Sequence, residues 1–208
     1  STRQSTLFPY TTLFRSHAAG YAPALLCPDK ASVLECDRLV EQAVAKDVPG
    51  VIKRQGPLLK LHAANGKTVE WRNASSTAEP QQTTWACDYF PAFGFIRMCH
   101  RLMEASATEF VNIRSGDSVA VKGWPIYSPS GKRMLIVDGY DDTVFSLEIW
   151  RFEAGRLVRE FRAESPAGDG WETASWNSEH KITPQQELGR GDTQYILQNT
   201  DGWKILTR

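Results

Sequence analysis

The sequence has neither a long apolar run nor an excess of charge of one sign. No stretch of eighteen consecutive apolar residues occurs, which argues against a membrane-spanning helix of ordinary length. The chain carries 24 Lys and Arg residues against 24 Asp and Glu residues. No basic stripe of the kind that nucleic-acid binders use stands out. The sequence therefore predicts no nucleic-acid partner and no membrane span.

The usual motifs of nucleophilic catalysis and zinc binding are also missing. The sequence lacks a Gly-x-Ser-x-Gly turn, and its four histidines have no recognisable Ser or Cys partner motif. Neither the cysteine spacing nor the histidine spacing completes a zinc site. His100 lies on the same strand face as Ile96 and Met98, so we expect a buried structural histidine. No catalytic residue is assigned from the sequence.

The four cysteines that are present form two local pairs, Cys27 with Cys36 and Cys87 with Cys99. Four cysteines allow three connectivities. Because short loops close most easily, we expect one bond within each local pair. Disulfides imply an oxidising compartment, which favours a periplasmic or secreted protein.

The stretch SHAAGYAPALLC, residues 16–27, looks like the tail of an export signal, so residues 17–28 are interpreted as a possible signal remnant and lead-in. Ala18 and Ala19 occupy the small positions that precede a cleavage site. This pattern agrees with the oxidising compartment that the cysteines suggest. An Ala-rich cytosolic N-terminus is the alternative interpretation.

Residues 6–16, TLFPYTTLFRS, resemble in every position the in-frame translation of a common sequencing-library adaptor. We therefore expect residues 1–16 to be non-native, in a bacterial gene from an environmental sequence assembly. They are excluded from fold reasoning for that reason. Arg3 and Arg15 lie in this segment, so the remainder of the chain is slightly acidic.

One helix is predicted within residues 28–50, PDKASVLECDRLVEQAVAKDVPG. Apolar side chains recur there at helical spacing, among them Val33, Val40 and Val44. Pro49 and the glycine after it end the pattern.

After this helix the sequence is typical of antiparallel strands. Five turn signals separate β-rich runs: Asn65-Gly66, Ser115-Gly116, Ser130-Gly131, Ala154-Gly155 and Asp201-Gly202. Such pairs supply the positive φ angles of tight hairpins. No helix of crossover length separates the strands, which excludes a parallel α/β sheet. The predicted fold class is mainly β, with antiparallel sheets and one N-terminal helix.

The expected organisation has three parts after residue 28. Residues 29–72 form the helix and a β-hairpin, and residues 73–84 form an exposed, polar loop. Residues 85–208 form the main β region.

A weak repeat runs through the β region. Segments that start at Thr108, Thr143 and Thr193 share an aromatic residue two positions on, alternating apolar residues and a Gly turn. Trp124 and Trp171, each after a glycine and 47 residues apart, open the second and third units. Periods of this size are typical of stacked four-stranded blades.

The stretch SPSGKR resembles the Ser-Pro-Asp-Gly-Lys turn of TolB-like and WD40-like propeller blades, with Ser130 in place of the aspartate. With a YxPxxG pattern at Tyr89 and LxIW at Leu147, the layout also resembles exported bacterial proteins of unassigned function. The resemblance implies antiparallel sheets arranged as propeller-like blades over about residues 90–208. It implies no activity, because such blades carry many functions. A β-sandwich is the alternative architecture.

The acidic stretch VDGYDDT is the best polar cluster. Asp138, Asp141 and Asp142 would present three carboxylates to calcium, which prefers several oxygen ligands. A plain acidic turn without metal is the alternative. Two carboxylates among Asp138, Asp142 and Glu148 would instead serve the hydrolysis of a glycosidic bond. No cofactor other than calcium is suggested.

Three aromatic residues are candidate ligand-binding residues: Trp124, Tyr140 and Trp171. Aromatic faces stack on sugars or peptides, although aromatics in stacked sheets more often fill the core. The Arg-Gly-Asp tripeptide at 190–192 is interpreted as a turn.

Together these features predict an exported, non-enzymatic binding or interaction protein with a protein or carbohydrate ligand. The alternative is an exported hydrolase that acts on carbohydrate through the acidic loop. An open edge of an outer sheet would also let a second copy of the chain pair as a homodimer.

Overall fold

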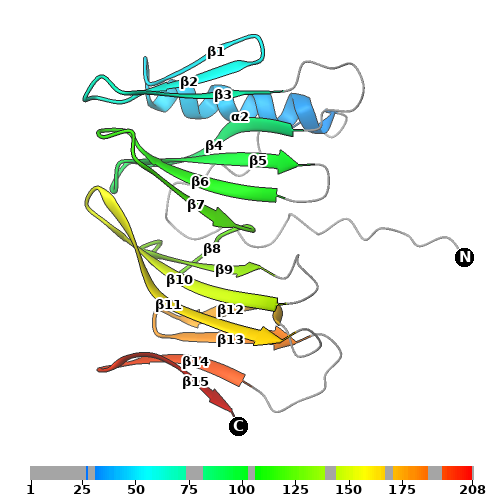
Figure 1. Cartoon of the computed structure of the whole chain (residues 1–208), viewed down its shortest axis with the longest axis vertical. Coiled ribbons are helices and arrows are strands. Elements are labelled where there is room, and N and C mark those ends of the chain that lie inside the picture. Colours follow the sequence, from blue (N-terminus) through cyan, green and yellow to red (C-terminus); the bar gives the residue numbers. More distant parts are fainter. Residues whose placement is uncertain are drawn as a thin grey trace, which may run out of the picture.

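Four antiparallel sheets and one helix make up the described part of the chain. The computed structural model describes residues 27, 31–73, 82–102, 106–138, 144–166, 171–186 and 194–207. The sheets, here named A to D, lie one above the next along the long axis in chain order (Figure 1). Within the described residues each sheet has two edge strands and none closes on itself. The predicted fold class is therefore confirmed as mainly β and antiparallel.

The helix, α2 (Val33–Asp47), begins at a capping box. The Ser32 hydroxyl accepts the Glu35 backbone N–H, and the Glu35 side chain accepts the Ser32 backbone N–H. Two of the unpaired donors at the helix start are satisfied in this way. Val40 and Val44 are buried, as the spacing predicts, whereas Val33, at the first helical position, is 61% exposed and does not belong to the buried face.

Sheet A consists of β1 (Ile52–Gln55), β2 (Leu58–His62) and β3 (Thr68–Arg72). Its inner face contributes Leu59 and Leu61 to a core shared with α2 and sheet B. Its outer face is polar, with an ion pair between Lys60 and Glu70 across β2 and β3. Sheet A thus ends the stack with a face suited to water.

Sheet B consists of β4 (Gln82–Phe90), β5 (Phe95–Leu102), β6 (Ser106–Asn112) and β7 (Ser118–Lys122). Both of its faces are buried. Ile96 and Met98 of β5 face sheet A and α2, whereas Phe95 and Phe110 face sheet C. Because β4 starts at Gln82, the last residues of the loop expected at 73–84 belong to this strand.

The free edge of β4 is covered by α2 and by two side chains. α2 packs along β4. The Asn73 amide accepts the Thr84 N–H and donates to the Thr84 carbonyl, as a neighbouring strand would. Arg54 donates to the same carbonyl and pairs with the buried Glu41 of α2. The edge is therefore protected against pairing with another chain.

Sheet C consists of β8 (Ile126–Tyr127), β9 (Arg133–Asp138), β10 (Val144–Glu153) and β11 (Arg156–Pro166). Its face toward sheet B holds Phe152, which lies 5.1 Å from Phe90 between ring centroids. Its other face holds Leu147 and Ile149, both fully buried against sheet D. Alternation along β10 places these two side chains on the same face of the strand.

Sheet D consists of β12 (Trp171–Ser178), β13 (Lys181–Gln186), β14 (Gln194–Asn199) and β15 (Gly202–Thr207). Ile182 and Ile196 pack against sheet C. β15 is an edge strand that pairs with β14 alone, and it exposes Ile205 and Leu206.

The glycine turns occur where the sequence places them. All five predicted turn glycines have positive φ and lie where two paired strands connect, with Gly202 as the first residue of β15: Gly66, Gly116, Gly131, Gly155 and Gly202. Thr108 lies in β6, and β10 and β14 start just after Thr143 and Thr193. The three repeat segments therefore all fall at the third strand of a four-stranded meander. No helix in the described residues is long and apolar enough to cross a membrane.

Candidate functional site

Both predicted disulfides are present. Cys27 bonds Cys36 at the start of α2, with Cα atoms 5.2 Å apart. Cys87 bonds Cys99 between the neighbouring strands β4 and β5, with Cα atoms 5.8 Å apart. A β-bulge lies beside Cys87, between Ala86 and Asp88. The second disulfide fixes this irregular part of the strand pair, in a buried cluster with Trp85 and with Val40 of α2.

A buried arginine lies next to that disulfide. Arg97 of β5 donates from Nε to the Cys87 sulfur at 3.1 Å and from Nη1 to the Tyr127 hydroxyl at 3.2 Å. Its Nη2 lies 3.8 Å from the Asp88 carboxylate. The Arg97 Cζ lies 5.9 Å from the ring centroids of both Trp124 and Tyr127. We call Asp88, Arg97, Trp124 and Tyr127 the Arg97–Trp124 site.

The electrostatics of this site follow from burial. Arg97 and Asp88 are 8% and 1% exposed, and a buried charge is tolerated only with an opposite charge or hydrogen-bond partners. Burial also raises the pKa of Tyr127, so its phenol stays protonated at neutral pH. The guanidinium is thus held among a carboxylate, a neutral phenol and two aromatic faces.

Trp124 forms the accessible part of the site. It lies in the connection between β7 and β8 and is 44% exposed. Gly123 before it has φ +82°, and a Cβ there would lie 2.8 Å from the Val137 carbonyl oxygen. Only glycine therefore lets this connection run so close to the end of β9. Thr108 fixes it further by donating to the Gly123 carbonyl at 3.1 Å.

Of the acidic residues predicted to bind calcium, the structure describes only Asp138. Asp138 ends β9, next to Val137, and its carboxylate lies 3.8 Å from Lys122 Nζ. Tyr140, Asp141 and Asp142 lie outside the described residues, as does the tripeptide at 190–192. Among the described residues, no group of three His, Cys, Asp or Glu side chains is placed to hold a metal ion. Asp138 and Trp124 are predicted site residues that follow two backbone positions in close approach, Val137 and Gly123.

Trp171 has a different position from Trp124, although each follows a glycine in the sequence. It is 3% exposed and packs with Leu147, Ile182 and Ile196 between sheets C and D. Its ring fills core, so it is not a surface for ligand stacking, and the expectation of such a role is corrected here.

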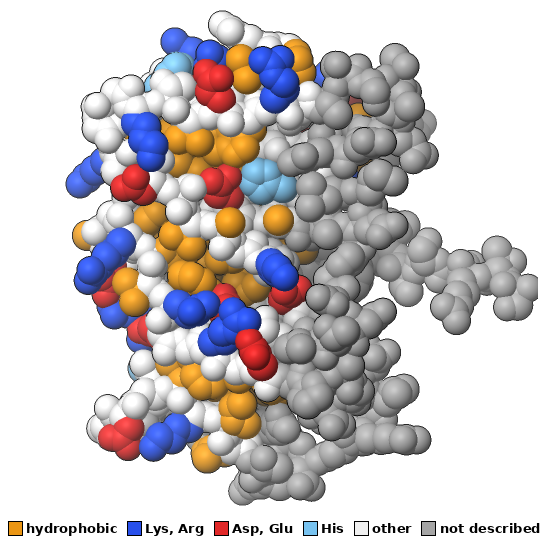
Figure 2. Space-filling model, viewed as in Figure 1, with side chains coloured by type: hydrophobic (Ala, Val, Ile, Leu, Met, Phe, Trp, Pro, Cys, Tyr) orange, Lys and Arg blue, Asp and Glu red, His pale blue; other side chains and the backbone are white. Residues whose placement is uncertain are grey.

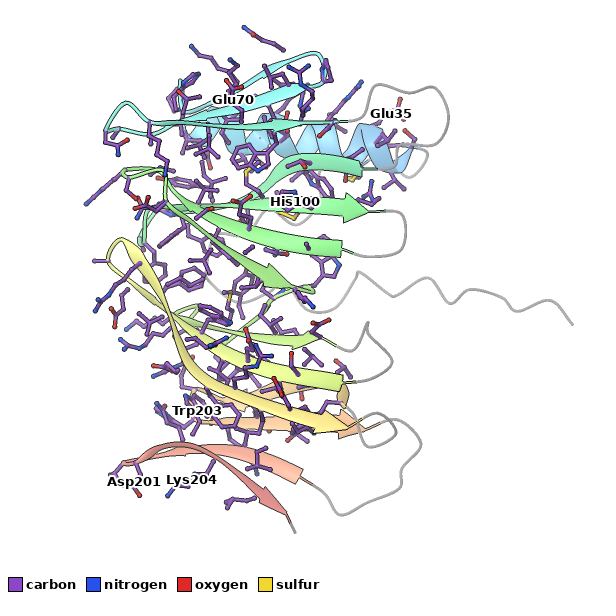
Figure 3. All side chains as sticks on the ribbon, viewed as in Figure 1. Glu35, Glu70, His100, Asp201, Trp203 and Lys204 are labelled. Carbon is purple, nitrogen blue, oxygen red and sulfur yellow. A yellow bond between two sulfur atoms is a disulfide. The ribbon has the colours of Figure 1, made fainter. Side chains whose placement is uncertain are left out.

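A second polar cluster lies between sheets A and B around His100, which Figure 3 labels on β5. Its Nδ1 lies 3.0 Å from Thr84 Oγ1, and its Nε2 lies 3.3 Å from Glu109 Oε2. Trp71 of β3 donates its indole N–H to the same Glu109 oxygen at 2.9 Å. His100 is largely buried, as expected, but it belongs to a hydrogen-bonded chain that the sequence analysis missed.

Glu109 is the charged end of this chain. Burial alone would raise its pKa. Hydrogen bonds from His100, Ser118 and Trp71 outweigh that effect and hold the pKa of Glu109 below its ordinary value. The carboxylate therefore stays ionised and fixes the indole of sheet A against sheet B.

Thr84, His100 and Glu109 have the order of groups found in a hydroxyl–imidazole–carboxylate triad. The hydroxyl of such a triad must reach a substrate, yet Thr84 is 2% exposed. The backbone N–H and carbonyl of Thr84 are also both hydrogen-bonded to the Asn73 side chain. This geometry favours a structural role for the cluster.

Glu148, the third carboxylate considered for hydrolysis, is bound within sheet C. Arg159 and Arg162 each donate to its Oε1 at 3.0 Å, and the Trp150 indole donates to its Oε2 at 2.8 Å. Its side chain is only 13% exposed. Basic and acidic side chains are interspersed in this way over the face shown in Figure 2, with apolar side chains between them.

Arg97 is the site residue that sequence reasoning missed. The sequence carries one signal for it: alternation places Arg97 on the same strand face as Phe95 and Cys99, between two apolar residues. Asp88 is paired with Arg97 by the register of β4 and β5, whereas the contact with Tyr127 depends on how sheets B and C stack.

Comparison of the chain with protein-family models and with curated proteins gave no match.

Proposed function

We propose that this protein is an exported, non-enzymatic binding protein that contacts its ligand through the Arg97–Trp124 site. The observation that carries the proposal is the position of Trp124. Its ring is 44% exposed, while a buried arginine supports it from behind. Binding surfaces commonly use an aromatic anchor of this kind, held rigid by its neighbours.

The architecture supports a binding role. Sheets B, C and D are successive four-stranded meanders with equivalent repeat segments at their third strands. We interpret them as propeller-like blades. In such an arrangement the connections between blades carry the ligand contacts, and Trp124 lies in the connection between sheets B and C.

Export is part of the proposal. Both disulfides lie in the described residues, and an oxidising compartment is where such bonds persist. A periplasmic or secreted location would also place the Trp124 surface in contact with extracellular peptides and glycans.

A hydrolase acting in the same region is the second candidate, favoured by the position of Asp138 at the end of β9, where the Val137 carbonyl lies against Gly123. Glycosidic hydrolysis needs two carboxylates at a defined separation. The Glu148 carboxylate is already bound by Arg159 and Arg162 in sheet C, which disfavours it as the second carboxylate. A reducing-sugar assay with wild type and Asp138→Asn decides this point, and the binding proposal predicts no turnover by either protein.

The binding proposal is tested by probing the full chain and Trp124→Ala on glycan and peptide arrays. The matched control is Leu206→Ala, which removes another exposed apolar side chain, on sheet D. Probes retained by wild type and by the control, but lost with Trp124→Ala, are the expected result. Equal retention by all three proteins would remove Trp124 from the proposal.

A further inference from the structure

The Arg97–Trp124 site presents one free aromatic face in a neighbourhood of balanced charge. We infer that its ligand is a neutral saccharide, which rests on the binding function proposed above. The inference depends on three features: the free face of Trp124, the balance of charge, and the hydrogen-bonding groups of Lys122 and Asp138.

The position of the Trp124 ring is fixed by its neighbours in the absence of ligand. The guanidinium of Arg97 lies over the ring at 5.9 Å, so a ligand must use the remaining exposed surface. Pro125, which is buried, restricts the backbone of the preceding Trp124 to extended conformations. With Gly123 anchored by Thr108, the indole is preorganised, which lowers the entropy lost on binding. The C–H face of a pyranose ring is an apolar surface of matching size.

The charged side chains of this region form two pairs of opposite sign, one behind the ring and one at Lys122, two residues before Trp124 in the chain. Arg97 lies 3.8 Å from Asp88, and Lys122 lies 3.8 Å from Asp138. Because Arg97 and Asp88 are buried, an anionic ligand would meet the Asp138 carboxylate and a cationic ligand would meet the Lys122 ammonium. Each would leave part of its charge against a like charge, which disfavours it. A neutral ligand avoids this cost.

The side chains of Lys122 and Asp138 keep hydrogen-bonding groups that a sugar can use. The 3.8 Å separation of Lys122 Nζ and Asp138 Oδ2 is longer than a hydrogen bond. The Lys122 side chain is 79% exposed and that of Asp138 is 19% exposed. An ammonium offers three donors and a carboxylate only acceptors. Sugar hydroxyls both donate and accept, so they can bridge this pair without displacing it.

Isothermal titration calorimetry of the full chain tests the inference. The neutral probes are cellohexaose and chitohexaose, whose equatorial substituents leave C–H groups on both ring faces. The charged probe is hexagalacturonate, and an array-selected peptide serves as the non-saccharide probe. We expect binding of at least one neutral hexasaccharide, weakened at least tenfold by Trp124→Ala and several-fold by Asp138→Asn. Trp124→Phe keeps an aromatic face and should stay within about threefold of wild type.

The outcomes separate the two claims. Trp124-dependent binding of hexagalacturonate or of the peptide, without binding of either neutral hexasaccharide, overturns the saccharide inference and leaves the binding function standing. Absence of Trp124-dependent binding for every probe overturns both. Thermal melting of each variant shows that it is folded, and Trp124→Phe supplies the comparison if Trp124→Ala is not.

Discussion

The indole Nε1 of Trp203, on β15, donates a 3.1 Å hydrogen bond to Oε2 of Glu160, on β11. Figure 3 labels Trp203. The same carboxylate accepts from Arg133 at 2.7 Å and from Arg151. Burial alone would raise the pKa of Glu160, but these hydrogen bonds together hold it below its ordinary value. Sheets C and D are therefore joined by a polar contact as well as by their apolar core.

Removal of the Glu160 carboxylate should separate these donors from their acceptor. Hydrogen bonds to charged groups contribute about 1.5–3 kcal/mol, and their loss leaves donors unpaired. We expect Glu160→Ala to lower the free energy of unfolding by about 2–3 kcal/mol in urea denaturation. Glu164→Ala, on the same strand, removes a carboxylate that is 55% exposed and should cost less than about 1 kcal/mol. Equal effects of the two changes would contradict the account.

The core between sheets C and D should depend on Leu147. This side chain is fully buried, and truncation of a buried leucine leaves a cavity. Leu147→Ala should cost about 2–5 kcal/mol in equilibrium unfolding. Leu206→Ala, at a position 47% exposed, is the matched control and should cost well under 1 kcal/mol. A small effect at Leu147 would mean that sheets C and D do not pack as described.

Stability at low pH should depend on Glu109, whose pKa is lowered in the folded protein. An unfolded Glu titrates near about pH 4.3. The stabilisation from Glu109 is therefore complete above that pH and is lost as the pH falls through its folded pKa. Glu109→Gln should be less stable than wild type at pH 7, by about 1–2 kcal/mol, and the difference should shrink below about pH 4.

Asp37 provides a control of opposite sign. Its pKa is raised, first by burial, against the opposing effect of Arg101. Its ionisation therefore costs stability as the pH rises from the unfolded pKa to the folded one. Wild type should gain stability relative to Asp37→Asn as the pH falls toward about 4, whereas it should lose stability relative to Glu109→Gln. Parallel pH profiles of the two variants would contradict both assignments.

Peptide mapping without reduction should recover the bonds Cys27–Cys36 and Cys87–Cys99. A loop of this length contributes about 2–3 kcal/mol in the chain-entropy treatment. Cys87→Ser with Cys99→Ser should therefore lower the free energy of unfolding by that amount. Four free thiols in protein recovered from the periplasm or medium would remove the main support for export.

Local features of the fold could be predicted from the sequence because each depends on a few adjacent residues. The turn at Asn65-Gly66 needs only a residue pair that accepts positive φ. The Cys87–Cys99 bond closes a short loop, and the burial of Leu147 follows from alternation along one strand.

The clusters around His100 and Arg97 could not be predicted, because they depend on register and stacking. Thr84 reaches His100 only because β4 and β5 pair these two residues directly. Glu109 is a diagonal neighbour on the next strand. Likewise, Trp124 and Trp171 follow similar sequence signals, but one lies in a connection between sheets and the other on an inward strand position.

The most direct test of the central claim is an NMR titration that follows the indole N–H signals of the seven tryptophans. The Trp124 signal is assigned from its absence in Trp124→Phe, and the ligand is chitohexaose, cellohexaose or the best-retained array probe. The account predicts a saturable shift of the Trp124 signal, with the buried Trp171 signal unchanged. Saturable binding that moves other indole signals and leaves Trp124 in place would contradict it.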